Sequence, residues 1–416
     1  MPHPKPVERI ELNQEHVGPR LLAACVLLVI GAGLLAYSFM RWLSPVGEEW
    51  ITVEASSSEG AGCGSEFNFI YHPGSGELSY SADRKAVTTV YSQLCRDAFE
   101  LFHEKEAFEG VNNVYAINRH PNEILEVEDG LYKALALVEQ SGSRAIYLGP
   151  VYSRYDDLFF CEDDSQLVDF DPRLNADVAE EYREITRFAG DPDAIRVELL
   201  GEGKIRLYVS EEYLTYARQE EIETFIDFAW MRNAFIADFM AEALIEKGYT
   251  YGVLSSYDGF TRNLDARGTD YTYPLYHRQG ETILSPAELH YSGPMSLVRM
   301  RDYPLSGLDL QQYYTLQTGE IRTLYLDTAD ALCKSAIDTL VCYSREKGCA
   351  QLLLEMIPVY IADGFQEEAV AALAGDGIQS IYCRDGVVRY TDPAAVLENF
   401  FDWDGVRYSA GQIALS

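Results

Sequence analysis

"IDFAWMRNAFIADF", residues 226–239, is the stretch that decides the fold. Its first residues are typical of a strand end, and from Arg232 the apolar spacing is that of an amphipathic helix. Asp227 and Asp238 lie eleven residues apart, one at the predicted strand end and one inside the helix. Strand–helix junctions often cradle ligands, yet this junction has no glycine. The pattern predicts a strand over 223–230, a helix over 232–248 and two acids that need partners.

The composition is that of a folded, acidic protein. The chain has 416 residues, 47% of them hydrophobic and 24% charged, and a formal net charge of −33. This apolar content is enough for one large domain or two small ones. A surface so acidic repels nucleic acid and anionic lipid, so nucleic-acid binding is excluded as the main function.

One segment near the start differs from the rest. "LLAACVLLVIGAGLLAYSFM", residues 21–40, is twenty residues long and carries no charge, which is enough to cross a bilayer as a helix. Basic residues precede it and acidic residues follow it, which orients the N-terminus inward. We therefore expect a single-pass plasma-membrane protein with its main domain outside the cytoplasm. The predicted segments are a cytoplasmic tail over 1–20, an uncleaved anchor over 21–43, a linker over 44–63 and an extracytoplasmic domain over 64–416.

Seven of the eight cysteines lie beyond the predicted anchor, and they form no C-x-x-C pair. This spacing disfavours a zinc site. Because seven is odd, at least one thiol is unpaired. One disulfide remains open, and the sequence does not identify its two cysteines.

Helical and strand-like patterns alternate through the remaining chain, with glycine or turn residues between them. They predict an α+β domain with a mixed sheet and packed helices. The predicted segments are helices over 85–105, 128–142 and 348–364, a hairpin over 195–210, strands over 251–259 and 338–344, a helix and hairpin over 367–391, and an acidic insertion carrying a helix over 159–185.

Four features follow one another along the chain: the opening stretch, Gly248, a strand near residue 254, and Asp258. This serial order resembles the ApbE family, the FAD:protein FMN transferases. Asp227 and Asp238 fall on the two acids of the family signature, and Asp258 falls on the acid of its Gly-Gly-Asp turn. Over about residues 66–390, the resemblance implies an ApbE-like, T-fold-related domain. It also implies FAD and Mg²⁺ as cofactors, and FMN transfer to a threonine of an exported flavoprotein.

The glycines of that signature are replaced. The first junction glycine is Ala229, the family lysine is Asn233, and the glycine after it is Ala234. The paired glycines before the acid are Ser256 and Tyr257. A Cβ obstructs a backbone that must wrap closely around phosphate, so the sequence predicts a cradle that is narrowed or filled.

Further landmarks follow in the family order. "YAINRHPN", residues 115–122, keeps Asn118. "SGSRAIYLGPVY", residues 141–152, keeps Gly142, Gly149 and Pro150 but has Ala145 at the aspartate position.

"QYYTLQTG", residues 312–319, keeps Thr318 and Gly319 but has glutamine at the histidine position. The family's metal ligands align with Gln351 and Glu355, which share one helix face. A carbonyl oxygen and a carboxylate could hold a hard cation. The alternative is that they only cap and solvate the helix start.

The resemblance implies a role for each matched residue. Asp258 would be the catalytic acid, and Gln351 and Glu355 would hold the metal. The residues implied at the cofactor are Asp227, Asn233, Asp238, Gly259, Thr318 and Gly319. Asp238 has an alternative role as the partner of a buried arginine, Arg232 or Arg262.

Two functions remain open from the sequence. One is a membrane-anchored FMN transferase with a degenerate site, whose partner is an exported flavoprotein or a membrane complex. The other is a non-catalytic relative that binds a flavin, or that binds a membrane partner protein with no cofactor at all.

Overall fold

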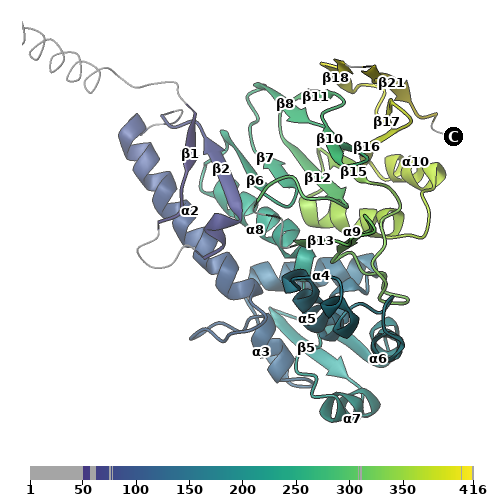
Figure 1. Ribbon diagram of the computed structural model, residues 1–416. Helices are drawn as coiled ribbons and strands as arrows, with labels where there is room; N and C mark the ends of the chain where they lie inside the picture. Colours follow the sequence, from purple (N-terminus) through teal and green to yellow (C-terminus); the bar gives the residue numbers. More distant parts are fainter. Residues whose placement is uncertain are drawn as a thin grey trace, which may run out of the picture.

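The computed structural model describes residues 50–56, 62–74, 76, 78–307, 309, 312–403 and 405–414. A nine-stranded sheet runs through the domain (Figure 1). Its neighbouring strands are antiparallel except β17 and β21, which are parallel. The strands in spatial order are β1 (Ile51–Val53), β2 (Phe67–Tyr71), β6 (Gly252–Ser256), β7 (Phe260–Asn263), β12 (Met295–Arg301), β15 (Thr339–Ser344), β16 (Gln379–Arg384), β17 (Val387–Tyr390) and β21 (Ser409–Gln412).

Three helices cover one face of this sheet, and a small sheet covers part of the other (Figure 1). The helices are α2 (Tyr80–Phe102), α8 (Arg232–Glu246) and α9 (Cys349–Tyr360), and α10 (Glu367–Gly375) lies against β16. The small sheet consists of β8 (Asp270–Pro274), β11 (Glu288–Ser292) and β18 (Val396–Glu398). Every residue of β15 is buried because Leu340 and Cys342 face the helices while Val341 and Tyr343 face the small sheet.

A second lobe, in the lower half of Figure 1, is built from the residues between α2 and α8. Its sheet has the order β3-β5-β4. Its elements are α3 (Val114–Arg119), β3 (Ile124–Glu126), α4 (Asp129–Ser141), α5 (Gly149–Tyr155), α6 (Ala176–Gly190), β4 (Ile195–Gly201), β5 (Lys204–Val209) and α7 (Glu211–Gln219). The predicted helix over 128–142 is confirmed, and it stops at Gly142 in the left-handed conformation. The helix of the acidic insertion begins only at Ala176.

Short elements complete the described chain. The two-residue and three-residue strands pair as β9 (His277–Gln279) with β10 (Thr282–Leu284), β13 (Tyr313–Thr315) with β14 (Ile321–Thr323), and β19 (Asp402–Trp403) with β20 (Val406–Arg407). The 3-10 helices are η2 (Gly62–Ser65), η3 (Ala145–Leu148), η4 (Asp156–Phe160), η5 (Gln166–Asp169) and η6 (Ala229–Met231). The predicted hairpin over 195–210, the strand over 338–344 and the helix–hairpin over 367–391 are confirmed.

The predicted strand over 223–230 is wrong. Its backbone is not paired with another strand but with the buried side chain of Asn118. The Asn118 amide oxygen accepts hydrogen bonds from the N–H groups of Phe225 and Ile226, both at 2.9 Å, and its nitrogen donates to the Ile226 carbonyl at 2.9 Å. One side chain thus satisfies the polar groups that a neighbouring strand would otherwise satisfy. The helix that follows is confirmed as α8.

The predicted anchor over 21–43 lies outside the described residues. None of the helices within the described ranges combines the length and hydrophobicity that a bilayer span requires. The seven cysteines beyond the predicted anchor are all free thiols in this structure.

The role of Asn118 leads to a first prediction. Asn118→Ala leaves three buried backbone groups without partners, so we expect a loss of about 2–4 kcal/mol in the free energy of unfolding. Urea denaturation measures this loss. The control is Asn112→Ala, which removes one exposed bond to the Glu126 carbonyl and should change stability by less than about 1 kcal/mol. Equal effects of the two variants would contradict the assigned role.

Candidate functional site

An open cleft of about 330 Å³ lies where η6 meets α5, η4 and the turn between β6 and β7. Aromatic side chains form much of its wall: Tyr152, Phe160, Trp230 and Tyr257. Charged groups also line it, namely Glu104, Lys105, Asp156, Asp227 and Arg232. The cleft therefore combines flat apolar surface with hydrogen-bonding groups, as small-molecule sites do. Sequence reasoning missed Glu104, Lys105, Tyr152 and Phe160, which carry no motif.

Asp227 lies in the cleft directly before η6. Its Oδ1 accepts a hydrogen bond from the Ala229 N–H at 2.7 Å. Ala229 has φ +43°, a left-handed conformation that glycine adopts far more easily. The family resemblance implies a glycine at this position. The backbone therefore follows a path that suits glycine, with alanine in its place.

Burial raises the pKa of Asp227 to about 7, and the nearby charge of Glu104 raises it further. The Asp227 carboxyl is thus partly protonated at neutral pH. A carboxyl in this state can accept or donate a proton to a ligand in the cleft.

Trp230 fills the junction that precedes α8. Its side chain is buried, and its indole ring packs edge-on against Tyr325 with ring centroids 4.8 Å apart. The indole lines the cleft next to the N-terminus of α8, where a phosphate group would bind. Three carboxyl groups, of Glu104, Asp156 and Asp227, line the same cleft against Lys105 and the ion-paired Arg232. This excess of negative charge does not fit the diphosphate of FAD.

Asp258 lies on the turn between β6 and β7. Its Oδ2 accepts a hydrogen bond from the Asn233 side-chain amide at 3.0 Å, and the same amide donates to Glu66 Oε2 at 3.1 Å. The buried guanidinium of Arg301 donates to the Asp258 carbonyl at 3.3 Å and pairs with Asp309. These contacts hold the turn in place from α8 and β12.

The environment of Asp258 also shifts its titration. Burial raises the pKa of Asp258 to about 6, and the charge of Glu66 raises it further. The hydrogen bond from Asn233 acts in the opposite direction but is outweighed. Asp258 is therefore the second carboxyl in this region that can exchange a proton near neutral pH.

Asp258 does not line the open cleft. It lines a separate cavity of about 10 Å³, which has room for at most about one water molecule. Trp230, Gln312 and Leu324 line both this cavity and the cleft. These three residues therefore stand between Asp258 and any ligand in the cleft.

Asp238 lies outside the cleft and the Asp258 cavity. Its two carboxylate oxygens accept hydrogen bonds from the N–H groups of Cys349 and Ala350, both at 2.9 Å, at the start of α9. It also forms an ion pair with Arg262 on β7. These contacts support the alternative of a buried arginine partner, while Arg232 pairs with Glu66 instead.

Gln351 and Glu355 lie together on α9, and neither lines the cleft or the Asp258 cavity. Glu355 Oε1 accepts hydrogen bonds from Lys347 Nζ at 2.7 Å and from the Gln351 amide at 3.1 Å. The ammonium group of Lys347 thus pairs with the Glu355 carboxylate. The Gln351 amide points its nitrogen, rather than its oxygen, toward the same carboxylate. Among the described residues no three His, Cys, Asp or Glu side chains form a metal-binding group. The pair as it stands does not fit Mg²⁺, which requires oxygen ligands.

The remaining predicted residues occupy turns. Gly259 follows Asp258 with φ +119°, and a Cβ there would lie 2.5 Å from the Arg299 carbonyl on β12. It therefore allows the turn to pack closely against the sheet. Thr318 and Gly319 form the exposed turn between β13 and β14, away from the cleft.

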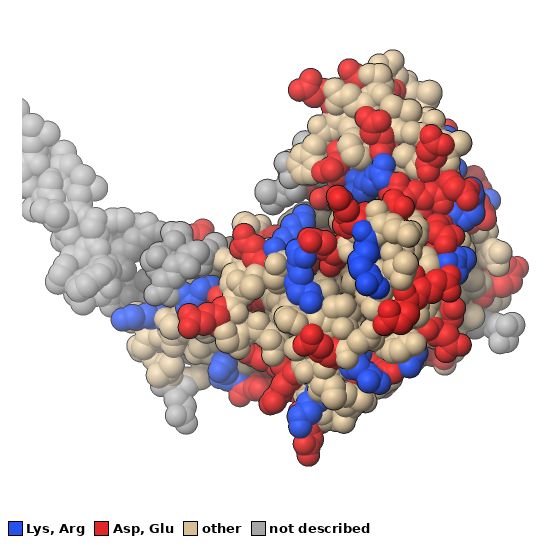
Figure 2. All heavy atoms as spheres, turned by 90° about the horizontal axis from the view of Figure 1, so that it is seen from below, with Lys and Arg blue, Asp and Glu red and all other residues tan. Residues whose placement is uncertain are grey.

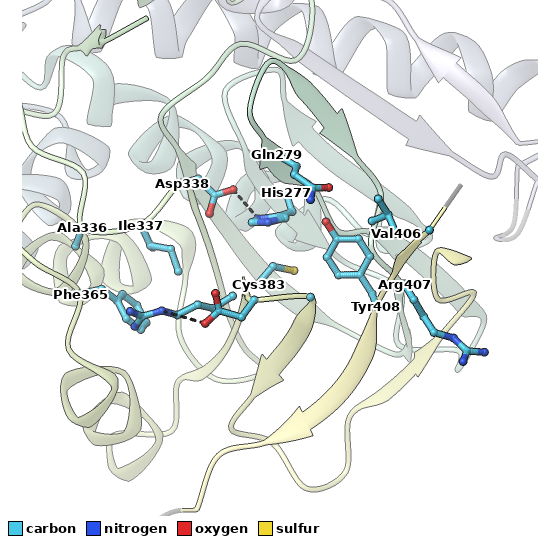
Figure 3. Close-up of a pocket in the computed structure, with 14 residues that line it drawn as sticks. His277, Gln279, Ala336, Ile337, Asp338, Phe365, Cys383, Val406, Arg407 and Tyr408 are labelled. Atoms are coloured by element: carbon cyan, nitrogen blue, oxygen red, sulfur yellow. Dashed lines mark hydrogen bonds and ion pairs between the residues drawn. The ribbon is translucent and has the colours of Figure 1, made fainter. Parts of the chain in front are cut away.

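A second cavity, of about 700 Å³, lies beside β9 and the turn between β16 and β17 (Figure 3). His277 and Asp338 form a hydrogen bond of 2.8 Å on its wall, and the Tyr408 ring packs edge-on against His277. Arg384 and Arg407, at the rim, pair with Asp385 and Asp402. Because these charges are paired, the cavity presents no excess of either sign.

Acidic side chains are spread over the face of the molecule seen in Figure 2, with Lys and Arg between them. That face carries no continuous basic surface of the kind that binds polyanions. The basic residues that line the cleft are Lys105 and Arg232, and Arg232 is paired with Glu66. The acidic residues that line it are Glu104, Asp156 and Asp227.

No protein-family model and no curated protein sequence matches this chain. Solved structures do match. The ApbE protein of Thermotoga maritima aligns with a TM-score of 0.54 at 12% identity, over 85% of this chain and 97% of that one. The chain has an ApbE-like fold. The flavin transferase ApbE of Vibrio cholerae aligns with a TM-score of 0.51 at 11% identity, over 80% of this chain and 93% of that one. These identities establish similarity of fold for the ApbE-like chain and nothing finer.

The raised pKa of Asp258 predicts a pH-dependent stability. In the unfolded chain this carboxyl ionises near pH 4, and in the folded protein near pH 6. Its favourable contribution is complete below about pH 4 and is lost as the pH rises through about 6. Relative to wild type, Asp258→Asn should therefore gain about 2 kcal/mol between pH 4 and pH 8.

Urea denaturation of both proteins at the two pH values measures this change. The control is Asp193→Asn, an exposed aspartate, whose difference from wild type should stay constant with pH. A constant difference for Asp258→Asn as well would contradict the raised pKa.

Proposed function

We propose that this ApbE-like protein binds a flavin ring in the Asp227 cleft and does not transfer FMN by a metal-dependent route. The observation that carries the proposal is the separation of Asp258 from the cleft by Trp230, Gln312 and Leu324. The ion pair between Lys347 and Glu355 also supports the proposal. Glu355 is one of the two residues that the resemblance implies as metal ligands, and here its carboxylate binds an ammonium group instead.

The dimensions of the cleft favour the ring over the whole dinucleotide. Its volume of about 330 Å³ lies at the lower end of the range for ligand sites. Tyr152, Trp230 and Tyr257 offer aromatic surface on which a planar ring can pack. Asp227 and Lys105 can form hydrogen bonds with the polar edge of such a ring. Riboflavin and FMN are therefore the expected ligands.

FMN transfer is the second candidate function. It is favoured by Asp227 and Asp258, whose raised pKa values of about 7 and about 6 suit proton transfer from an acceptor hydroxyl. The known activity of the matched structure, named a flavin transferase, agrees with this candidate. It requires that the wall formed by Trp230, Gln312 and Leu324 opens.

The cellular setting is part of the same proposal. The apolar segment 21–43 would anchor the chain in the plasma membrane, with the ApbE-like domain outside. An exported flavoprotein or a membrane complex would then be the partner. Protease treatment of intact cells tests the orientation, because only an external domain is digested before lysis.

Flavin binding is tested on the full-length protein in detergent by flavin fluorescence. We expect quenching with riboflavin and FMN, weaker binding of FAD, and no effect of adding Mg²⁺ or EDTA. Tyr257→Ala should weaken FMN binding at least tenfold, since it removes an aromatic wall. The control Tyr208→Ala changes a tyrosine on β5 outside the cleft. Mg²⁺-dependent binding of FAD alone would favour the transferase, and no binding at all would refute both functions.

Trp230→Gly tests the filled junction directly. Removal of the indole joins the cleft to the Asp258 cavity and frees the N-terminus of α8 for phosphate. We expect FAD affinity to rise at least tenfold relative to FMN affinity, measured by the same titration. Trp403→Gly, an exposed tryptophan on β19, should leave the ratio unchanged. An unchanged ratio in a folded Trp230→Gly protein would show that the indole does not exclude the diphosphate.

A further inference from the structure

We propose that Cys63 and Cys95 are a site of covalent modification, and that they form a disulfide when the chain folds in an oxidising compartment. The bond would join η2, which lies between β1 and β2 and overlaps the end of the predicted linker, to the middle of α2. This inference does not depend on flavin binding, and no motif in the sequence distinguishes these two cysteines from the other five.

The Cys63 thiol lies against Cys95. The nearby Cys95 side chain raises the pKa of the Cys63 thiol. The Cys63 thiol also donates to the Cys95 carbonyl, with a distance of 3.3 Å between Sγ and O. Both side chains are buried, with exposed fractions of 1% and 0%. The residues are 32 positions apart, so the contact is tertiary rather than local.

Gly62 gives an independent reason to regard this contact as built into the fold. It has φ +53°, and a Cβ there would lie 2.3 Å from the Cys95 carbonyl oxygen. Such a distance is not tolerated by a real side chain. The backbone of η2 therefore approaches α2 closely only because residue 62 is glycine, and this approach places Cys63 against Cys95.

The other described cysteines have different neighbours. Cys342 lies 3.2 Å from the Ser380 hydroxyl, and Cys349 donates to the Thr261 carbonyl at 3.3 Å. Cys333 accepts from the Thr323 N–H at 3.2 Å. The thiol pair that the structure brings together is thus Cys63 with Cys95, which resolves the choice that the sequence left open.

The reaction is an ordinary thiol–disulfide exchange. A thiolate of one cysteine attacks a disulfide oxidant, and a mixed disulfide forms as one oxidant thiol leaves. The second cysteine then attacks this mixed disulfide and releases the other oxidant thiol. The two protein thiols lose two protons and two electrons in total, and the oxidant takes up both electrons as two thiols.

Folding and oxidation should occur together. The hydrogen bond with Cys95 and burial raise the pKa of the Cys63 thiol, so its thiolate is scarce in the folded protein. An oxidant also cannot reach buried sulfur. The exchange therefore belongs to the folding chain, as it does in exported proteins.

The test is oxidative refolding of the full-length chain. The reduced protein is unfolded in urea, refolded in detergent with reduced and oxidised glutathione, alkylated, and digested with trypsin. Mass spectrometry without reduction should find peptide 42–84 linked to peptide 86–96 as the main linked species. Cys342→Ser should retain this link, and Cys63→Ser should lose it. Reduction should lower the Tm of the wild type by about 5 °C and leave the Tm of Cys63→Ser unchanged.

Gly62→Ala tests the geometry with both thiols present. The added Cβ should lower the linked fraction at least twofold, while Gly190→Ala, at an open position, should not. Refolded wild type with all thiols free, or several links in equal amounts, would overturn the proposal. Where refolding fails, the full-length protein extracted from cells under acid and alkylated in denaturant is analysed for the same link, and free Cys63 and Cys95 there would overturn it too.

Discussion

The carboxylate of Asp238 is the contact on which the arrangement of the domain depends. It lies inside an apolar helix, where an unpaired charge would be very costly. Arg262 on β7 and two N–H groups at the start of α9 satisfy it, so one side chain joins α8, the sheet and α9. Gly348 is required beside it, because a Cβ there would lie 2.3 Å from the carboxylate. These contacts fix the position of α8. They thereby also fix where the residues in the first turn of α8 lie.

Asn233, in the first turn of α8, affects the protonation of Asp258. Its amide lies between Glu66 and Asp258, at the position where the family resemblance implies a lysine. A lysine would supply positive charge to both carboxylates, whereas an amide supplies only hydrogen bonds. The charge of Glu66 therefore acts on Asp258 without a counter-charge from residue 233, and this contributes to the raised pKa of Asp258. Burial is the larger cause of the raised pKa of Asp258, so residue 233 adjusts a pKa that the packing around the turn has already raised.

The sequence predicted what local patterns decide and failed where distant residues decide. The helix ending at Gly142 and the hairpin over 195–210 depend on turn residues within a few positions. The extended segment before η6 is held by Asn118, 107 positions away from Phe225, which no periodicity reveals. Likewise, the order of motifs predicted that Asp227, Asn233 and Asp258 would gather near one junction. The order of motifs could not predict the ion pair between Lys347 and Glu355, because this contact depends on how the chain enters α9.

The junction without glycine can now be understood from its two central residues. Ala229 keeps a left-handed conformation at a cost of about 1 kcal/mol, so the surrounding contacts impose the turn rather than the residue itself. Asp227 contributes by accepting from the Ala229 N–H. Trp230 follows directly, and its buried indole packs against Tyr325. The junction thus combines a backbone conformation that glycine adopts more easily with a bulky aromatic side chain. Both features depend on contacts with residues that are distant in the sequence, so the absence of glycine does not by itself change the path of the chain.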